Sequence, residues 1–319
     1  MAILVTGAAG FIGYHVARAL LDRGERVLGL DNLSPYYDPA LKKARLARLE
    51  GKGFSFQALD IARRDEVAEF GRGHPEIDRI VHLAAQAGVR HSLEHPFDYV
   101  DANVTGHLSM LELGRHLPRL ENLVYASSSS VYGGNTQLPF STSDRTDDPV
   151  SLYAATKKAG EMMSVAYARL FGIKATGLRF FTVYGPWGRP DMSVFLFTKA
   201  ILEGRPIQVF NNGDMRRDFT FIDDIVQGVL ASLDRPAPGH RVYNLGNNRA
   251  EPLLRFIEVI EKAAGRKAIV ELKPMQKGDV KETFADIEDA TRDLGFRPTT
   301  PIDIGVPRFV DWYRGFYKV

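Results

Sequence analysis

Short apolar runs alternate with longer amphipathic stretches through the first half of the chain. The runs predict buried strands, which we place at Ile3–Thr6, Arg26–Leu30, Phe54–Leu59, Arg79–Leu83 and Asn122–Ala126. The stretches between them predict helices at Phe11–Leu21, Pro39–Leu49, Asp65–Phe70 and Phe97–Leu117. Strands that are apolar throughout and separated by helices are typical of parallel sheets covered on both faces, so the predicted fold class is α/β with a doubly wound parallel sheet.

The alternation continues with a helix at Leu152–Phe171 and a strand at Lys174–Phe180, and it ends after Tyr184. Glycine and proline then separate short elements. We therefore expect a first domain over residues 1–183 and a smaller α/β substrate-binding domain over residues 184–319.

A later segment has the pattern of the first half again. Phe221–Leu233 predicts an amphipathic helix and Val242–Leu245 a buried strand. The two domains are therefore expected to be interleaved, with residues from about 219 to 245 contributing to the first.

The composition is that of a globular protein, with 45% hydrophobic and 25% charged residues and a formal net charge of +2. A charge so small, without blocks of like charge, argues against nucleic acid or a membrane surface as the partner. The sequence contains no run of about 20 apolar residues that could span a bilayer. Its N-terminus does not have the pattern of a signal peptide, so we expect a cytoplasmic protein.

Cysteine is absent, which excludes disulfides, thiol catalysis and thiolate metal sites. The histidines are expected to be core or surface residues, and no metal site is predicted.

The segment GAAGFIG at residues 7–13 directly follows the first predicted strand and opens the first helix. Gly7, Gly10 and Gly13 allow a tight turn, a close approach of the backbone to a pyrophosphate, and close packing of helix on strand. Asp31 ends the second strand, 18 residues after Gly13, near the spacing of about 20 found in Rossmann dinucleotide-binding sheets. Its carboxylate can accept hydrogen bonds from a ribose diol and would repel a 2′-phosphate, so NAD is favoured over NADP.

Other cofactor contacts are expected beside this turn and after the next strands. Asp60, at the end of the third strand, is a predicted adenine contact. The remaining predicted cofactor-binding residues are Phe11, Ile12, Asn32, Ile61, Leu83, Ala84 and Ala85.

Tyr153 and Lys157 are four residues apart near the start of a predicted helix, so their side chains share a face. A free phenol has a pKa of about 10, and a nearby ammonium favours the phenolate that a general base requires. Ser128, Ser129 and Ser130 directly follow the fifth strand, where ligands bind in open parallel sheets. A hydroxyl there can bridge Tyr153 and a sugar oxygen.

Six segments together carry a resemblance to a known family. They are GAAGFIG, LAAQAGVR, SSSSVYG, YAATKKAGE, LRFFTVYGPWGRPDM and DMRRDFTFIDDI. The chain resembles the extended short-chain dehydrogenase/reductase family, nucleotide-sugar epimerase branch, and within it the UDP-glucuronate 4-epimerases. The resemblance implies Ser128, Tyr153 and Lys157 as catalytic residues, with Lys157 also binding the nicotinamide ribose.

The reaction that the resemblance implies has three steps. Tyr153 takes the proton of the sugar C4 hydroxyl while hydride moves from C4 to NAD. The 4-keto sugar turns over within the site, and hydride then returns to its opposite face.

Related dehydratases and decarboxylases carry acidic residues just before the VYG segment, where this chain has Ser129 and Ser130. A serine hydroxyl cannot act as the general acid–base that removes the C5 proton at neutral pH, which favours simple epimerisation. Arg189 matches an arginine that grips the C5 carboxylate, and a guanidinium can hold a carboxylate with two parallel hydrogen bonds. We hypothesise that this grip and the serines prevent loss of CO₂ from the β-keto acid intermediate.

The resemblance also implies contacts to the UDP group. Arg217 matches a pyrophosphate-binding arginine and Asp279 a uridine-ribose acceptor, and the backbone of Gln208, Val209 and Phe210 faces the uracil. Thr182 replaces the asparagine of UDP-galactose 4-epimerases, a departure that weakens the neutral-hexose alternative.

Three alternatives stay open: a UDP-glucose/UDP-galactose 4-epimerase, a UDP-glucuronate decarboxylase, and a non-catalytic NAD-binding regulator. By analogy with the family, a homodimer is expected through the helices predicted at Phe97–Leu117 and Leu152–Phe171.

Overall fold

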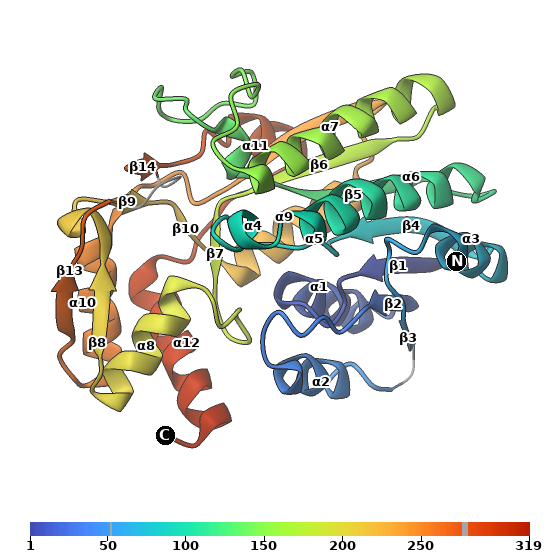
Figure 1. The fold of residues 1–319 in the computed structure, drawn as a ribbon. Helices are drawn as coiled ribbons and strands as arrows, with labels where there is room; N and C mark the ends of the chain where they lie inside the picture. The colour runs from blue at the N-terminus through green and yellow to red at the C-terminus, as the bar shows by residue number, and fades with distance from the viewer. Residues whose placement is uncertain (52, 276–279) are drawn as a thin grey trace.

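Seven parallel strands form the central sheet of the protein, which we describe from a computed structural model covering residues 1–51, 53–275 and 280–319 (Figure 1). The strands are β1 (Ala2–Thr6), β2 (Val27–Asp31), β3 (Phe54–Ala58), β4 (Ile77–His82), β5 (Asn122–Ser128), β6 (Ala175–Phe180) and β11 (His240–Leu245). Their order is β11-β6-β5-β4-β1-β2-β3, and every neighbouring pair is parallel. The chain thus starts in the middle, builds to one edge and then reverses, which makes the carboxyl ends of β1 and β4 a topological switch point where ligands bind.

Helices cover both faces of this sheet (Figure 1). The helices associated with it are α1 (Phe11–Asp22), α2 (Pro39–Ala47), α3 (Arg64–Gly73), α4 (His91–Glu94), α5 (Pro96–Val100), α6 (Gly106–His116), α7 (Leu152–Phe171), α9 (Ile222–Asp234) and α11 (Glu288–Leu294). The helices α1 and α9 pack together on one face, whereas α6 packs between α3 and α7 on the other. The predicted doubly wound α/β fold is therefore confirmed.

The strand β1 shows why the apolar runs in the sequence are continuous. Its residues Ile3 and Val5 belong to one core cluster, together with residues of α1 and α9. Ala2 and Leu4 belong to a second cluster, together with residues of α3 and α6. Since both faces of the strand are covered, every position must be apolar or small.

The helix predicted at Phe97–Leu117 is interrupted in the structure. A π turn at Asp101–Thr105 separates α5 from α6. The Asn103 side chain in this turn accepts a hydrogen bond from the Gln86 N–H (2.9 Å) and donates to the Gln86 carbonyl (3.0 Å) and to Thr156 Oγ1 (3.1 Å). The turn thus ties the segment after β4 to α7, and π turns of this kind are frequent at functional sites.

A second, smaller group of elements packs beside the sheet (Figure 1). Its helices α8 (Ser193–Glu203) and α12 (Ile302–Tyr317) both pack against α10 (Leu253–Ala264). The short strands are β7 (Thr182–Tyr184), β8 (Pro206–Val209), β9 (Arg216–Arg217), β10 (Phe219–Phe221), β12 (Glu251–Pro252), β13 (Ile269–Leu272) and β14 (Glu282–Thr283). After β10 the chain returns from this second group to the central sheet, where α9 packs on α1 and β11 pairs with β6.

Within the described ranges, no helix combines the length and the apolar character that a membrane span requires.

A buried ion pair joins α7 to the sheet. Glu161 on α7 accepts hydrogen bonds from Arg179 Nε (2.8 Å) and Nη2 (2.9 Å) on β6, and from Ser127 Oγ (2.7 Å) on β5. Burial acts to raise the pKa of Glu161, but the hydrogen bonds and charge of Arg179 outweigh it and hold that pKa below its ordinary value. Through Arg179 and Ser127, Glu161 therefore fixes the helix that carries Tyr153 and Lys157 against β6 and against β5, the strand that carries Ser128.

We predict that Arg179→Leu lowers the free energy of unfolding by about 3–5 kcal/mol, because it removes the buried cation that pairs with Glu161 and leaves its carboxylate only the more exposed Lys158 (3.3 Å). Urea unfolding followed by circular dichroism measures the change. Arg63→Ala, which removes an exposed pair with Glu66, is the control and should change the same quantity by less than about 0.5 kcal/mol. A loss below about 1 kcal/mol in Arg179→Leu would show that the buried pair does not hold α7.

Candidate active site

A cleft of about 1250 Å³ runs along the carboxyl ends of the central strands and between the two groups of elements. Single drug-sized ligands occupy pockets of about 300–1,000 Å³, so this cleft has room for two ligands side by side. Residues from α1, β2, β5, α7, α8 and β8 line it, together with the segments that directly follow β1 and β4.

The turn between β1 and α1 admits only glycine at two positions. Gly7 has φ +71°, and a Cβ there would lie 2.8 Å from the backbone nitrogen of Ala84. A Cβ on Gly13 would lie 2.0 Å from the carbonyl oxygen of Gly7. The turn therefore brings bare backbone to the cleft at the start of α1, where free N–H groups and the helix dipole favour phosphate.

Asp31 is buried at the end of β2 with its carboxylate held in place. It accepts hydrogen bonds from the backbone N–H of Ala9 (3.2 Å) and of Leu33 (2.8 Å). Lys42 Nζ from α2 lies 3.8 Å from Asp31 Oδ1, a cation that the sequence reasoning missed because nothing in the spacing brings α2 to β2. The carboxylate keeps acceptor capacity for a ribose diol, since it has about four lone-pair sites.

The other predicted cofactor residues border the same part of the cleft. Asn32 Nδ2 donates to Asp60 Oδ2 at 3.1 Å, which fixes the two side chains against each other. The residues predicted for the cofactor that line the cleft are Gly7, Gly10, Phe11, Ile12, Gly13, Asp31, Asn32, Asp60, Ile61, Leu83, Ala84, Ala85, Tyr153 and Lys157.

Tyr153 and Lys157 lie in the first turns of α7 and face the cleft. The helix begins with Ser151, whose side chain caps it by accepting a hydrogen bond from the Ala154 N–H (3.1 Å). Lys157 Nζ lies 6.0 Å from the centre of the Tyr153 ring and donates to the Ala126 carbonyl of β5 (3.0 Å). The ammonium is thereby held beside the phenol, as the four-residue spacing requires.

Burial dominates the protonation of this pair in the protein alone. It raises the pKa of Tyr153, and a hydrogen bond with Ser128 and the charge of Arg189 only partly oppose it. Burial also lowers the pKa of Lys157 to about 8, and the charge of Arg189 adds to this effect. Burial, and not the lysine, is therefore the main influence on the pKa of Tyr153, and the phenol is protonated at neutral pH in the protein alone.

The serines form a tight turn after β5. Ser128 ends the strand and caps a 3₁₀ turn at Ser129–Tyr132, accepting a hydrogen bond from the Ser130 N–H (3.2 Å). Its hydroxyl donates to Ser130 Oγ (3.1 Å). All three hydroxyl-bearing residues line the cleft close to Tyr153.

Arg189 lies in the cleft with one edge of its guanidinium already paired. Its Nε donates to Asp191 Oδ1 (3.0 Å) and its Nη2 to Asp191 Oδ2 (2.5 Å), while the Tyr36 hydroxyl donates to Asp191 Oδ2 (3.0 Å). Burial and the charge of Asp191 raise the pKa of Tyr36 to about 12, so that it stays a neutral donor. A guanidinium has five N–H donors, and the edge formed by Nη1 and Nη2 is left for a second carboxylate.

The predicted UDP contacts have different outcomes. Thr182, Gln208, Phe210 and Arg217 line the cleft. The side chain of Val209 lies in the core through the alternation along β8, and its carbonyl accepts a hydrogen bond from the Lys273 N–H (2.9 Å), while its predicted backbone contact with uracil stays a prediction. Asp279, the predicted uridine-ribose acceptor, lies outside the described residues.

Basic side chains outnumber acidic ones among the described residues of the cleft. The acidic residues are Asp31, Asp60 and Asp191. The basic residues are Lys42, Arg90, Lys157, Arg189, Lys199, Arg205 and Arg217. A cleft with this excess of positive charge suits ligands that carry several phosphates.

Comparison with known proteins agrees with this geometry. The chain is 47% identical over 332 residues to UDP-glucuronate 4-epimerase 3 of Arabidopsis thaliana, covering 99% of this chain and 77% of that one. It is 46% identical over 342 residues to a probable UDP-glucuronate 4-epimerase of Rhizobium meliloti, covering 100% and 98%. A crystal structure of the UDP-glucuronic acid 4-epimerase from Bacillus cereus, in complex with UDP-glucuronic acid and NAD, superposes with a TM-score of 0.93 at 35% identity and covers 99% of this chain and 100% of that one.

The model of the NAD dependent epimerase/dehydratase family matches residues 3–246, which include the glycine turn, the serines, the tyrosine–lysine pair and β11. The chain belongs to the NAD dependent epimerase/dehydratase family.

Proposed function

We propose that the protein catalyses the reversible C4 epimerisation of UDP-glucuronate to UDP-galacturonate, with NAD as cofactor and a 4-keto sugar as intermediate. One observation carries the proposal: the tyrosine–lysine pair and the partly buried guanidinium of Arg189 line the same cleft. The first are the groups that remove a hydroxyl proton, and the second is the group that holds a carboxylate. The identity of 46–47% to UDP-glucuronate 4-epimerases supports the same substrate.

The described residues fit NAD. The cradle at Gly7 and Gly13 has no space for a side chain, and Asp31 presents its carboxylate at the end of β2. NAD held there would supply the acceptor and donor of the C4 hydride, and a positively charged nicotinamide would favour the phenolate of Tyr153. We assign the cofactor to the residues of the glycine turn, the ends of β2 to β4, and Lys157.

The protein's own groups handle the proton and the sugar. Tyr153 accepts the proton of the C4 hydroxyl and later returns it, and Ser128 holds the sugar oxygen beside the phenol. Lys157, fixed by the Ala126 carbonyl, binds ribose and keeps a positive charge near Tyr153. Tyr153 thus acts first as a base and then as an acid. Because the hydride also returns to C4, the reaction involves no net redox change.

The position of the acids favours epimerisation over the related eliminations. Among the described cleft residues, Asp31 and Asp60 belong to the proposed cofactor side, and Asp191 is paired with Arg189. The places beside Ser128 carry the hydroxyls of Ser129 and Ser130. No carboxyl group among them is left to exchange a proton at C5, as a dehydratase requires.

Arg189 distinguishes this reading from a neutral-hexose 4-epimerase. Asp191 and Tyr36 hold one edge of the guanidinium, so a substrate carboxylate meets an arginine whose plane is already fixed. That fixes the plane of the carboxylate, away from the alignment that releases CO₂. A non-catalytic NAD-binding regulator would not need the paired Tyr153 and Lys157.

The uridine diphosphate is assigned to Thr182, Gln208, Phe210 and Arg217, with Asp279 as the proposed ribose acceptor. We also propose the domain division at residues 183 and 184, with residues from about 219 to 245 contributing to the cofactor domain. A cytoplasmic location without nucleic-acid or membrane partners stays a prediction from the sequence.

A homodimer is proposed through α5, α6 and α7. These helices pack side by side, since α5 and α6 both contact α7. They expose large apolar side chains, namely Phe97, Val100, Leu108, Met162, Leu170 and Phe171. An apolar face of this kind is typical of a surface that meets another protein.

Incubating the purified protein with UDP-glucuronate and NAD, and following products by NMR, tests the function. We expect UDP-galacturonate without accumulation of NADH or release of CO₂. Formation of UDP-xylose or a UDP-4-keto-pentose would move the assignment to a decarboxylase. Turnover of UDP-glucose instead of UDP-glucuronate would move it to the neutral-hexose epimerases.

Lys157→Met should abolish turnover while raising the free energy of unfolding at pH 7 by an amount on the order of 1–3 kcal/mol. The pKa of Lys157 in the folded protein, about 8, lies below the ordinary lysine value of 10.5, so burial of the ammonium costs stability below pH 8. The wild type regains that stability as pH rises from about 8 to 10.5, where the unfolded chain binds more protons. Denaturation at pH 7 and pH 10 measures this, with Lys262→Met on the exposed side of α10 as control. Equal or lower stability of Lys157→Met at pH 7 would contradict it.

Arg189→Ala should lower kcat/KM for UDP-glucuronate at least tenfold and release CO₂, because hydrogen bonds to charged groups contribute about 1.5–3 kcal/mol each. Asp191→Asn keeps the shape but weakens the support of the guanidinium, so a smaller loss with measurable CO₂ is expected. Product analysis by NMR with trapping of labelled CO₂ measures both. Full epimerase activity in Arg189→Ala would defeat the assignment of the carboxylate grip.

A further inference from the structure

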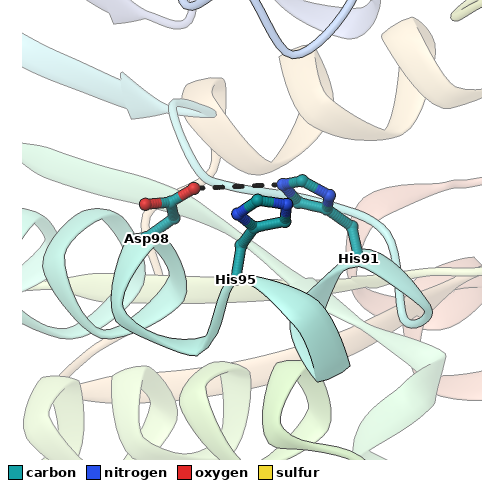
Figure 2. Close-up of side chains that lie close together, drawn as sticks. All are labelled: His91, His95 and Asp98. Atoms are coloured by element: carbon teal, nitrogen blue, oxygen red, sulfur yellow. Dashed lines mark ion pairs between the residues drawn. The ribbon is translucent and has the colours of Figure 1, made fainter.

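Three side chains with metal-binding atoms gather where α4 meets α5, as Figure 2 shows. They are His91, His95 and Asp98, and their ligand atoms all lie within 4.8 Å of one another. His91 Nε2 lies 3.9 Å from Asp98 Oδ2, and the two imidazole rings are stacked with their centres 4.2 Å apart. None of these residues has a part in the epimerisation proposed above.

Part of this cluster is visible in the sequence. His91 and His95 are separated by three residues, a spacing at which two histidines often bind one ion. The expectation that the histidines are only core or surface residues did not take it into account. Asp98 is brought in by the turn between α4 and α5, which no spacing rule describes.

We propose that His91, His95 and Asp98 form a binding site for a divalent transition-metal ion of the Zn²⁺ class. Two imidazoles and one carboxylate suit Zn²⁺, whereas Mg²⁺ and Ca²⁺ prefer oxygen ligands alone. With bonds of about 2.0–2.2 Å, ligand atoms of a tetrahedral site lie roughly 3.3 Å apart. His95 and Asp98 are exposed, so small rotations of their side chains bring the three atoms to that separation. Water completes the fourth position.

His91 is the ordered member of the site. It is half-buried, and its ring lies 4.7 Å from the ring of Tyr36 and 6.0 Å from that of Tyr99. The Tyr99 hydroxyl donates to the carbonyls of Ala87 (2.9 Å) and Gly88 (2.5 Å), which holds the segment before α4 in place. One ligand is thus fixed before the ion arrives, which reduces the entropy lost on binding.

The site adjoins one wall of the cleft, which is formed by the segment between β4 and α4. His91 lines the cleft, and its neighbour Tyr36 supports Asp191 and, through it, Arg189. An ion that joins α4 to α5 therefore restrains the wall beside which the keto sugar must turn over. We infer that turnover falls as the site fills, a consequence that rests on the proposed function, whereas the binding itself does not.

Isothermal titration of the metal-free, full-length protein with Zn²⁺ tests the site. We expect one ion per chain, and an affinity at least about tenfold lower in His95→Gln and in Asp98→Asn, because loss of even an outer partner of a metal ligand costs 10–100-fold. His116→Gln, which changes an exposed histidine on α6, is the matched control and should bind as the wild type does. Without Zn²⁺, His95→Gln should turn over UDP-glucuronate at the wild-type rate, and with Zn²⁺ it should resist inhibition.

Several results would overturn the proposal. Unchanged Zn²⁺ affinity in His95→Gln and Asp98→Asn would place the ion elsewhere. A rise in mass by light scattering that accompanies binding would show an ion held between chains instead of within one. If Zn²⁺ binds at this site and turnover is unchanged, the effect on the cleft wall is refuted, although the binding site itself is supported. If the metal-free protein shows no turnover at all, the proposed function is wrong, and the calorimetry still tests the metal site.

Discussion

The attachment of α7 to β5 and β6 is the constraint on which the site depends. Ser128 belongs to β5, whereas Tyr153 and Lys157 belong to the helix, so their separation is set by how the helix lies on the sheet. The Glu161–Arg179 pair and the bond from Lys157 to the Ala126 carbonyl join the two from inside the protein. Proton transfer needs heavy atoms within about 2.6–3.2 Å, and a helix held only by apolar contacts would leave that distance loosely defined.

The closeness of Arg189 to Lys157 and Tyr153 affects the pKa of both groups. The charge of Arg189 acts on both Tyr153 and Lys157, favouring loss of the proton in each. Asp191 balances that charge and keeps Arg189 protonated, with Tyr36 holding the carboxylate. The carboxylate grip and the proton-transfer pair are therefore one electrostatic unit, in which a change at Asp191 is felt at the phenol.

The wall between β4 and α5 connects three features that lie apart in the sequence. Asn103 fixes its backbone at Gln86 and Tyr99 fixes it at Ala87, and the centres of the Tyr99 and Tyr153 rings lie 6.0 Å apart, edge to face. The cluster of His91, His95 and Asp98 sits at the outer end of this wall (Figure 2). Packed aromatic rings, those of Tyr36 and Tyr99, therefore lie between the surface of α4 and the cleft.

The sequence by itself determined the features that depend on neighbours along the chain. Continuous apolar strands alternating with helices predicted the doubly wound sheet, and the glycine turn with Asp31 predicted the cofactor site, because both follow from local geometry at fixed spacing. The four-residue step from Tyr153 to Lys157 placed two side chains on one helix face for the same reason.

Only the tertiary structure decided what depends on contacts between distant segments. It paired Arg189, through Asp191, with Tyr36, and it brought Lys42 to Asp31. It also turned Val209 into the core and broke the helix after α5 with a π turn. The pKa of Tyr153 belongs here as well, because burial, which no spacing reveals, outweighs the charges placed beside it.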